Sequence, residues 1–353
     1  MQYTTLGNTG LVVSRLAFGA MTFGVGELVP GVSNNIDQTA ADQMVGRALE
    51  AGINLFDTAD AYTSGQSEII LGKALAQCRH EVVIATKVGF RTGPALTDTG
   101  LSARHIIAAA EESLKRLGTD YIDLYQIHIP DPLTPPEETV RALDDLVRRG
   151  LVRYLGFSNF PAWKAARMLA IQERYGYARF VGAQMYYSLL GRDLEQEIVP
   201  FVQDAGMGVL VWSPLAGGFL SGKYTRENPT PEGARLNQFK LPPIDVEKGY
   251  DVVDLLQQIA ANYQATPAQV ALAWMLSKPF VSSIIVGANK MRHLEDNLGA
   301  VNLSLSAQEV EQLDTLSAPP PLYPGWMQPL GWDVQVKAAL DAQPEVPVTE
   351  GPA

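Results

Sequence analysis

The sequence predicts a single α/β domain over residues 1–317, built as a (β/α)8 barrel. Two observations lead to this prediction. Short, almost wholly apolar runs alternate with segments of helical periodicity, and strands of that character suit a parallel sheet that is buried on both faces. Eight such units follow one another without an obvious second domain, which favours a closed barrel over an open doubly wound sheet.

The chain begins with a predicted cap. The runs 3–5 and 11–13 flank the turn-forming sequence Asn8-Thr9-Gly10, so we expect an N-terminal β-hairpin. The strands of the barrel are then predicted at residues 15–19, 53–56, 82–86, 121–127, 152–157, 180–184, 208–212 and 283–286.

Helical periodicity separates these strands. Ser102 suits an N-cap, Pro267 suits a first helical turn, and Gly118 suits a left-handed C-terminal cap. The predicted helices cover residues 38–51, 67–76, 103–117, 137–149, 162–174, 194–205, 249–262, 267–277 and 291–298. Residues 20–37 and 213–247 are predicted to be long loops at the C-terminal face of the barrel.

The last part of the chain, residues 318–353, has a different composition. It is too rich in proline to form a core element, and we expect a C-terminal tail that is partly disordered. Within the tail, residues 343–353 are the ones expected to be disordered.

Composition restricts the class of protein. No apolar run approaches the roughly 18 residues of a membrane helix, and the first residues lack the pattern of a signal peptide. A formal charge of −11 without a basic stripe argues against nucleic acid as a partner. The single cysteine, Cys78, fits a reducing compartment, so we expect a cytoplasmic protein. The histidines and this cysteine show no ligand spacing, and no metal site is expected.

Ionisable side chains stand where three of the predicted strands end. Asp57, Lys87 and His128 each directly follow an apolar run, and Tyr62 lies five residues beyond Asp57 in a polar loop. Neighbouring parallel strands lie about 4.8 Å apart. We therefore expect these four side chains to converge at one end of the sheet.

A tyrosine beside a lysine has a clear chemical use. Free tyrosine titrates near pH 10, and a nearby ammonium favours its phenolate form. Asp57 would supply the counter-charge for a partly buried Lys87, and His128 would hydrogen-bond a substrate oxygen. The set describes a proton donor for reduction of a carbonyl to an alcohol. Each residue alone also has an ordinary structural interpretation, such as a loop tyrosine, a snorkelling lysine, a core histidine or a turn-capping aspartate.

Several motifs make the interpretation more specific. They are Phe56-Asp-Thr-Ala-Asp-Ala-Tyr62, Ala85-Thr-Lys87, Asp123-Leu-Tyr-Gln-Ile-His128, Gly156-Phe-Ser-Asn159, Gln184-Met-Tyr-Tyr-Ser-Leu-Leu190, Ser213-Pro-Leu215 and Ser221-Gly-Lys223. In these motifs and in their order, the sequence resembles the aldo-keto reductase superfamily over roughly residues 1–317. The resemblance implies a (β/α)8 barrel that uses NADPH, less often NADH, without a metal. It also implies a catalytic tetrad of Asp57, Tyr62, Lys87 and His128, with Tyr62 as the general acid.

The resemblance further implies where a nicotinamide cofactor binds. Ser158, Asn159 and Gln184 match the residues that hold the carboxamide, and Trp212 stands where an aromatic ring stacks on the nicotinamide. The loop over the pyrophosphate would contribute Ser213, Leu215, Gly217, Ser221 and Lys223. The segment for the adenosine end would contribute Gly287, Asn289, Lys290, Arg292, Glu295 and Asn297, with Asp296 as an alternative to Glu295.

One departure bears on the choice of cofactor. Lys290 and Arg292 could neutralise a 2′-phosphate, so the expected cofactor is NADP(H). Many relatives carry arginine where His293 stands, and this departure leaves NAD(H) open as an alternative.

The resemblance leaves alternatives for the function. One is an NADP-dependent oxidoreductase acting on a small-molecule carbonyl or alcohol. Another is a cofactor-binding regulatory subunit like the β subunits of potassium channels, and a third is an isomerase or aldolase with a Schiff base on Lys87. The substrate and the oligomeric state are not readable from the sequence. Phe23, Tyr62, Trp163 and Trp326 are aromatic candidates for the wall of the substrate pocket.

Overall fold

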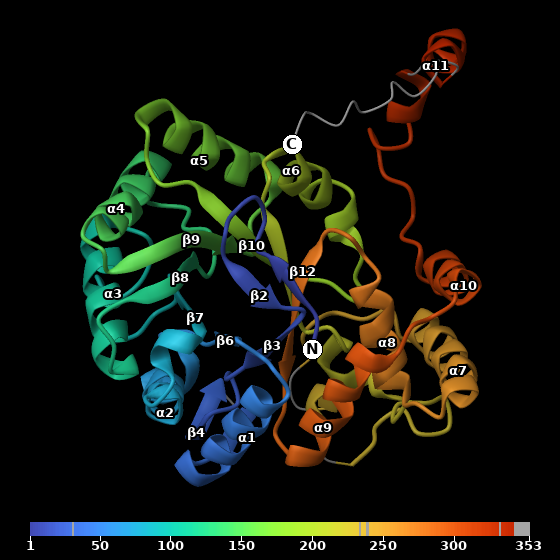
Figure 1. Ribbon diagram of the computed structural model, residues 1–353, viewed down its shortest axis with the longest axis horizontal. Coiled ribbons are helices and arrows are strands. Elements are labelled where there is room, and N and C mark those ends of the chain that lie inside the picture. Colours follow the sequence, from blue (N-terminus) through green and yellow to red (C-terminus); the bar gives the residue numbers. More distant parts are fainter. Residues whose placement is uncertain (30–31, 233, 238–239, 332, 342–353) are drawn as a thin grey trace, which may run out of the picture. The chain divides into compact units, whose positions relative to one another are not determined.

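The computed structural model describes residues 1–29, 32–232, 234–237, 240–331 and 333–341 (Figure 1). The chain divides into two compact units, Met1–Ala318 and Pro319–Ala353. The second unit contains a short 3-10 helix η7 (Gln328–Gly331) and the helix α11 (Val334–Asp341). Residues 343–353, which were expected to be disordered, lie outside the described residues.

The first unit is built on a closed barrel of eight parallel strands, as the sequence predicts. The last strand pairs with the first, so that Val286 lies beside Phe18 and the sheet closes. In barrel order the strands are β3 (Leu16–Gly19), β6 (Leu55–Asp57), β7 (Val83–Val88), β8 (Ile122–Ile127), β9 (Val152–Ser158), β10 (Phe180–Tyr186), β11 (Gly208–Trp212) and β12 (Val281–Gly287).

Helices surround the barrel and cover the outer face of the sheet (Figure 1). They are α1 (Gln38–Glu50), α2 (Gln66–Leu75), α3 (Ala103–Leu117), α4 (Pro136–Arg148), α5 (Ala162–Tyr175), α6 (Ile198–Asp204), α7 (Val246–Tyr263), α8 (Pro267–Leu276), α9 (Met291–Gly299) and α10 (Ala307–Ser317). Their ends follow the local chemistry. Ser102 accepts the backbone N–H of His105 at the start of α3, and Gly118 is left-handed at its end.

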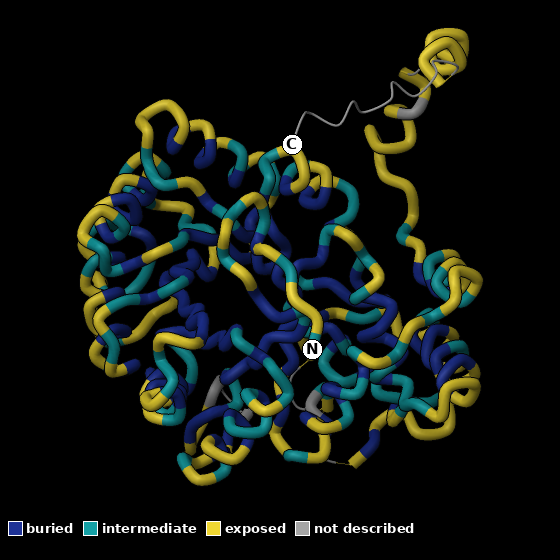
Figure 2. The backbone as a smooth tube through the Cα atoms, in the orientation of Figure 1, coloured by how far each residue is buried: buried dark blue, intermediate teal, exposed yellow. Residues whose placement is uncertain are grey.

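The predicted N-terminal hairpin is present and closes the bottom of the barrel. Its strands β1 (Tyr3–Thr5) and β2 (Val12–Ser14) pair antiparallel. Leu6, fully buried, follows the first strand and rests on the backbone of the barrel. A Cβ added at Gly208 would lie 2.6 Å from the Leu6 side chain, so only glycine permits this approach. The buried segments, dark blue in Figure 2, concentrate in the strands and on the inner faces of the helices.

Three element predictions need correction. Residues 20–37 are not a plain loop, because β4 (Gly24–Val29) and β5 (Val32–Ile36) form an antiparallel hairpin. Its glycines and asparagines are poor strand formers, and tertiary contacts described below support it.

The helix predicted at 194–205 is split, and two helices, α10 and α11, were missed. Arg192 binds Glu195 and holds a 3-10 turn η3 (Asp193–Glu195), so α6 begins only at Ile198. The missed helix α10 begins at a capping box of Ser306 and Glu309, a signal that the sequence contains.

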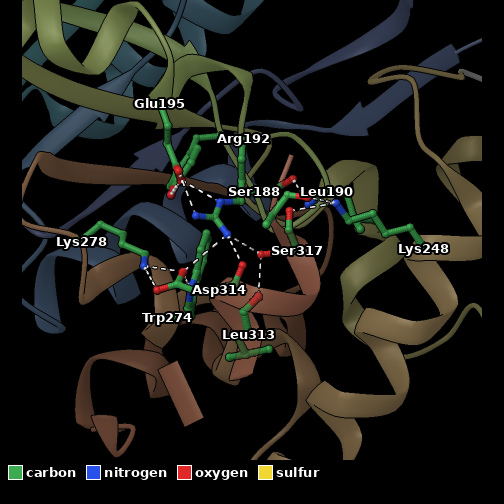
Figure 3. Close-up of polar contacts among 12 residues, drawn as sticks. Ser188, Leu190, Arg192, Glu195, Lys248, Trp274, Lys278, Leu313, Asp314 and Ser317 are labelled. Carbon is green, nitrogen blue, oxygen red and sulfur yellow. Dashed lines mark hydrogen bonds and ion pairs between the residues drawn. The ribbon is translucent and has the colours of Figure 1, made fainter. Parts of the chain in front are cut away.

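A polar cluster fastens η3 and α8 to α10 (Figure 3). Arg192 donates to Glu195, to the carbonyl of Asp314 and to the hydroxyl of Ser317. Lys278 pairs with the Asp314 carboxylate at 2.6 Å. No helix among the described ranges is long and apolar enough to cross a membrane.

Candidate active site

Four ionisable residues meet at the C-terminal ends of adjacent strands. Asp57 is the last residue of β6, Lys87 lies near the end of β7, and His128 directly follows β8. Tyr62 opens the 3-10 helix η1 (Tyr62–Gly65) in the loop after β6. The structure thus brings together the four residues singled out in the sequence.

Lys87 is the centre of this group. It is fully buried, and its ammonium donates to Asp57 Oδ1 at 2.6 Å and to the carbonyl of Thr58 at 2.7 Å. Its Nζ lies 5.1 Å from the centre of the Tyr62 ring. The Tyr62 ring in turn meets the His128 ring edge-on, with 5.6 Å between the ring centres.

The second carboxylate oxygen of Asp57, Oδ2, faces two glutamines. Gln184 donates to Asp57 Oδ2 at 2.7 Å, and Gln126 approaches the same oxygen at 3.5 Å. Gln184 is expected to contact a cofactor, and in this structure its amide nitrogen also donates to Asp57. Gln126 was missed. The available signal was a polar side chain late in β8, two residues before His128.

Burial and neighbouring charges together set the protonation of the group. Burial raises the pKa of the Tyr62 phenol, and the opposing effect of Lys87 only moderates this. The sequence argument that Lys87 favours the phenolate is therefore right in sign but incomplete. Burial disfavours the charged form of Lys87, yet Asp57 and Tyr62 together outweigh it and the pKa of the ammonium is raised. Burial, then Lys87, holds the pKa of His128 well below its usual value, so the imidazole is neutral.

The loop that carries Tyr62 is fixed by the β4–β5 hairpin. Thr63, left-handed with φ of 47°, accepts from the Asn34 side chain at 3.0 Å and donates to the carbonyl of Phe23 at 3.1 Å. The side chain of Gln66 pairs with the backbone of Val25 at 3.1 Å, as a strand would. These contacts hold the strained backbone next to Tyr62.

The aromatic residues near the site differ from those expected. Phe90 lies edge-on to His128 with 4.6 Å between ring centres, and it is 40% exposed. It was missed because nothing in the sequence sets it apart from other phenylalanines. Phe23, expected in the pocket wall, is fully buried, and its ring centre lies 5.5 Å from that of Phe18. Trp163 is 66% exposed.

The residues expected around a nicotinamide are adjacent in the structure. Asn159, with φ of 61°, donates to the carbonyl of His128 and to the hydroxyl of Ser158, both at 2.9 Å. The indole of Trp212 donates to Asn159 at 3.2 Å, and its ring lies 5.2 Å from that of Tyr186. This polar and aromatic surface borders the tetrad directly.

The loop after β11 turns sharply at two adjacent glycines. It forms the 3-10 helix η4 (Ala216–Ser221), in which Gly217 and Gly218 both have positive φ. Ser213 accepts the N–H of Gly217 at 3.1 Å, and Ser221 donates to the carbonyl of Gly218. The carbonyl of Leu215 accepts the N–H of Gly218 at 2.9 Å.

Cations from two separate loops gather beside this turn. Partial burial, then Arg292, Lys223 and Lys290, lowers the pKa of His293, which places the three cations around this imidazole. Asn289 bonds to His293 at 3.0 Å, and Gly287 ends β12 next to them. Three cations near one another would complement the negative charge of a dinucleotide phosphate.

The residues expected at the adenine have partners of their own. Glu295 binds Arg47 on α1 at 2.7 Å. Asp296 accepts from Thr266 at 3.0 Å, and Asn297 is buried. Among the described residues, no group of three or more histidine, cysteine or acidic side chains is placed to hold a metal ion.

Comparison with known proteins agrees with this geometry. The model of the Aldo/keto reductase family matches residues 15–318. An uncharacterized oxidoreductase of Bacillus subtilis is 39% identical over 90% of this chain and 96% of its own length. Versiconal hemiacetal acetate reductase of Aspergillus parasiticus is 34% identical over 92% of this chain and 99% of its own length. A Schizosaccharomyces pombe protein assigned as a voltage-gated potassium channel subunit beta is 37% identical over 88% and 92%.

Proposed function

This chain belongs to the aldo/keto reductase family, and we propose that it reduces aldehydes or ketones to alcohols, or catalyses the reverse, with NADP(H) as cofactor. The observation that carries the proposal is the contact of Tyr62 with a buried, charge-compensated Lys87 and a neutral His128. A lysine buried this deeply needs its counter-ion, and its remaining proton is available to a phenol.

Each side chain has a distinct role in this proposal. A bound nicotinamide supplies the hydride that reaches the carbonyl carbon. Tyr62 Oη gives its proton to the carbonyl oxygen, and Lys87 stabilises the phenolate that remains. The neutral imidazole of His128 donates a hydrogen bond to the same oxygen and fixes its position. Asp57 keeps Lys87 charged and in place.

The cation group supports NADP(H) over NAD(H). Lys223, Lys290 and Arg292 are together enough to neutralise a 2′-phosphate, although His293 is neutral and adds no charge. Trp212 and Asn159 would face the nicotinamide, and the turn at Gly217 would face the pyrophosphate.

A second candidate function is a cofactor-binding subunit that regulates another protein. It is favoured by relatives assigned as potassium channel β subunits, which are 37% and 36% identical to this chain. Such a protein would bind the cofactor with little or no turnover, so binding and turnover must be measured separately.

The test compares Tyr62→Phe with the wild type. Fluorescence titration with NADPH and NADH measures binding, and a panel of aldehydes, ketones and alcohols measures turnover. We expect equal NADPH binding and a loss of kcat on the order of 10²- to 10⁴-fold in the variant. Tyr154→Phe, near the N-terminal end of β9, is the matched control and should keep full activity.

The outcomes separate the two functions. Binding without turnover in the wild type would favour the regulatory subunit. A fully active Tyr62→Phe would overturn the proposed role of Tyr62, and a protein that binds neither nucleotide would overturn both functions.

A further inference from the structure

Asp60 is a buried carboxyl group that the proposed reaction does not use. It lies between Asp57 and Tyr62 in the loop after β6, and only 2% of its surface is exposed. Its backbone N–H reaches the carbonyl of Lys87 at 3.4 Å, so the residue sits against the strand that carries the lysine. Among the residues that the structure describes, neither carboxyl oxygen has a hydrogen-bond partner of normal geometry, although the adjacent N–H of Ala61 acts to lower the pKa of the carboxyl group.

Arg116, a basic side chain that favours the charged form of Asp60, is hydrogen-bonded to Glu68. Glu68 on α2, fully buried, accepts from Arg116 on α3 at 2.6 Å and from Thr86 on β7 at 2.6 Å. Glu68 therefore has partners for both of its oxygens, whereas Asp60 has none of normal geometry among the described residues. The two carboxyl groups are close enough to repel each other when both are charged.

The ionisable groups around Asp60 come from every neighbouring element. Glu68 disfavours its charge, whereas Arg116 and Lys87 favour it. Two phenols, Tyr62 on η1 and Tyr125 on β8, are each affected by a charge on Asp60.

Burial dominates this balance. An unpaired buried carboxylate is costly, and burial, then Glu68, raises the pKa of Asp60 to about 8. Asp60 is therefore a neutral acid at neutral pH and an anion in alkaline solution. The anion raises the pKa of Tyr62, because a negative charge nearby disfavours the phenolate.

We propose that Asp60 is a positioning residue that controls how readily Tyr62 releases its proton, because its buried carboxyl group lies against the strand that carries Lys87, two residues before Tyr62, and opposes phenolate formation when it is charged. This role rests on the proposed function, since it acts through Tyr62 as the acid and base. When Asp60 is ionised, Tyr62 keeps its proton up to a higher pH. Carbonyl reduction therefore remains active over a wider pH range.

The test is the pH dependence of kcat/KM in both directions for the wild type and Asp60→Asn. Asparagine has the same shape and is neutral at every pH. We expect the two proteins to agree below about pH 7. In alkaline solution the falling limb of reduction and the rising limb of oxidation should both move to lower pH in the variant. The shift should be equal in both directions, because one proton on Tyr62 controls both.

A matched control uses another carboxyl group whose pKa burial raises. Asp123, at the N-terminal end of β8, is paired with Arg79 and is remote from the tetrad. Asp123→Asn should leave both pH limbs in place. Should Asp60→Asn fail to fold, Asp60→Ser is also neutral at every pH and carries the same expectation.

Thermal unfolding gives a readout that needs no turnover. The folded protein holds the Asp60 proton to about pH 8, whereas the ordinary pKa is 3.8. The resulting stabilisation is complete below about pH 4 and is lost as the pH rises to about 8. The Tm of Asp60→Asn should therefore rise relative to the wild type between pH 5 and pH 8.

Three results would contradict these statements in different ways. Coincident alkaline limbs in an active Asp60→Asn would overturn the role of Asp60 and leave the reductase intact. A Tm difference independent of pH would overturn its protonation. A wild type without turnover on any carbonyl or alcohol would overturn the proposed function, and this role with it.

Discussion

Lys87 influences the protonation of each ring that faces it. Its charge opposes the effect of burial on Tyr62 and adds to the effect of burial on His128. A single buried cation thus favours a dissociable phenol and a neutral imidazole at once. A dissociable phenol can give its proton to a carbonyl oxygen, and a neutral imidazole can donate a hydrogen bond to the same oxygen.

We expect Lys87→Met to raise the pKa of His128 toward its ordinary value without reaching it, since burial is the larger cause. The variant should also be less stable by roughly 3–5 kcal/mol, because the buried Asp57 carboxylate loses its cation. Imidazole NMR as a function of pH and urea unfolding measure the two effects.

The control for this prediction is Lys73→Met, an exposed lysine on α2. It should change neither the titration of His128 nor the stability. An unchanged His128 titration in a folded Lys87→Met would show that burial alone keeps the imidazole neutral.

The sequence predicts the residues that stand at strand ends better than those that support them. Asp57, Lys87 and His128 were found because an ionisable residue after an apolar run is conspicuous. Gln126 and Phe90 were missed, because contacts across the barrel and between loops depend on register, which a single sequence does not specify.

At the scale of elements, the position of α10 depends on the polar cluster in Figure 3. Only 10% of the Arg192 side chain is exposed, and it bridges η3 to the last turn of α10. The indole of Trp274 and the ammonium of Lys278 hold Asp314 from the other side. The helix packs on the barrel through charged groups as well as through its apolar face.

We therefore expect Arg192→Met to destabilise the protein by roughly 3 kcal/mol, because Glu195 loses its cation in a largely buried place. Arg226→Met is the matched control. Arg226 also faces several carboxylates, including Asp251 at 2.7 Å, but 43% of its side chain is exposed. Exposed pairs are screened by water, so this variant should unfold at nearly the same urea concentration as the wild type. Equal losses in the two variants would contradict the importance of the cluster.

The hairpin β4–β5 shows why one element could not be predicted. Its glycines and asparagines have weak strand propensity, and its ladder is supported by Thr63 and Gln66 in the loop that holds Tyr62. Regular apolar periodicity, by contrast, was sufficient for the eight barrel strands, because each is buried by its neighbours on both faces.

At the scale of the whole molecule, the formal charge of −11 repels an anionic ligand. Binding of a dinucleotide must overcome this field locally. The cations Lys223, Lys290 and Arg292 lie in the segments that follow β11 and β12, and the pairing of these two parallel strands brings the segments side by side. The sequence indicated the cations but not their convergence.

The last prediction concerns this group of cations. We expect Arg292→Met to weaken NADPH binding on the order of tenfold, since a charge-assisted contact to the 2′-phosphate is lost. NADH lacks that phosphate, so its dissociation constant should change little. Fluorescence titrations at two salt concentrations should also show a smaller salt dependence for NADPH in the variant than in the wild type, because fewer charges are paired on binding.

Lys115→Met, an exposed lysine paired with Glu112 on α3, controls for the overall charge and should leave the binding of both nucleotides unchanged. Equal weakening of NADPH and NADH in Arg292→Met would place Arg292 at a part common to both nucleotides, and the preference for NADP(H) would then lack its physical basis.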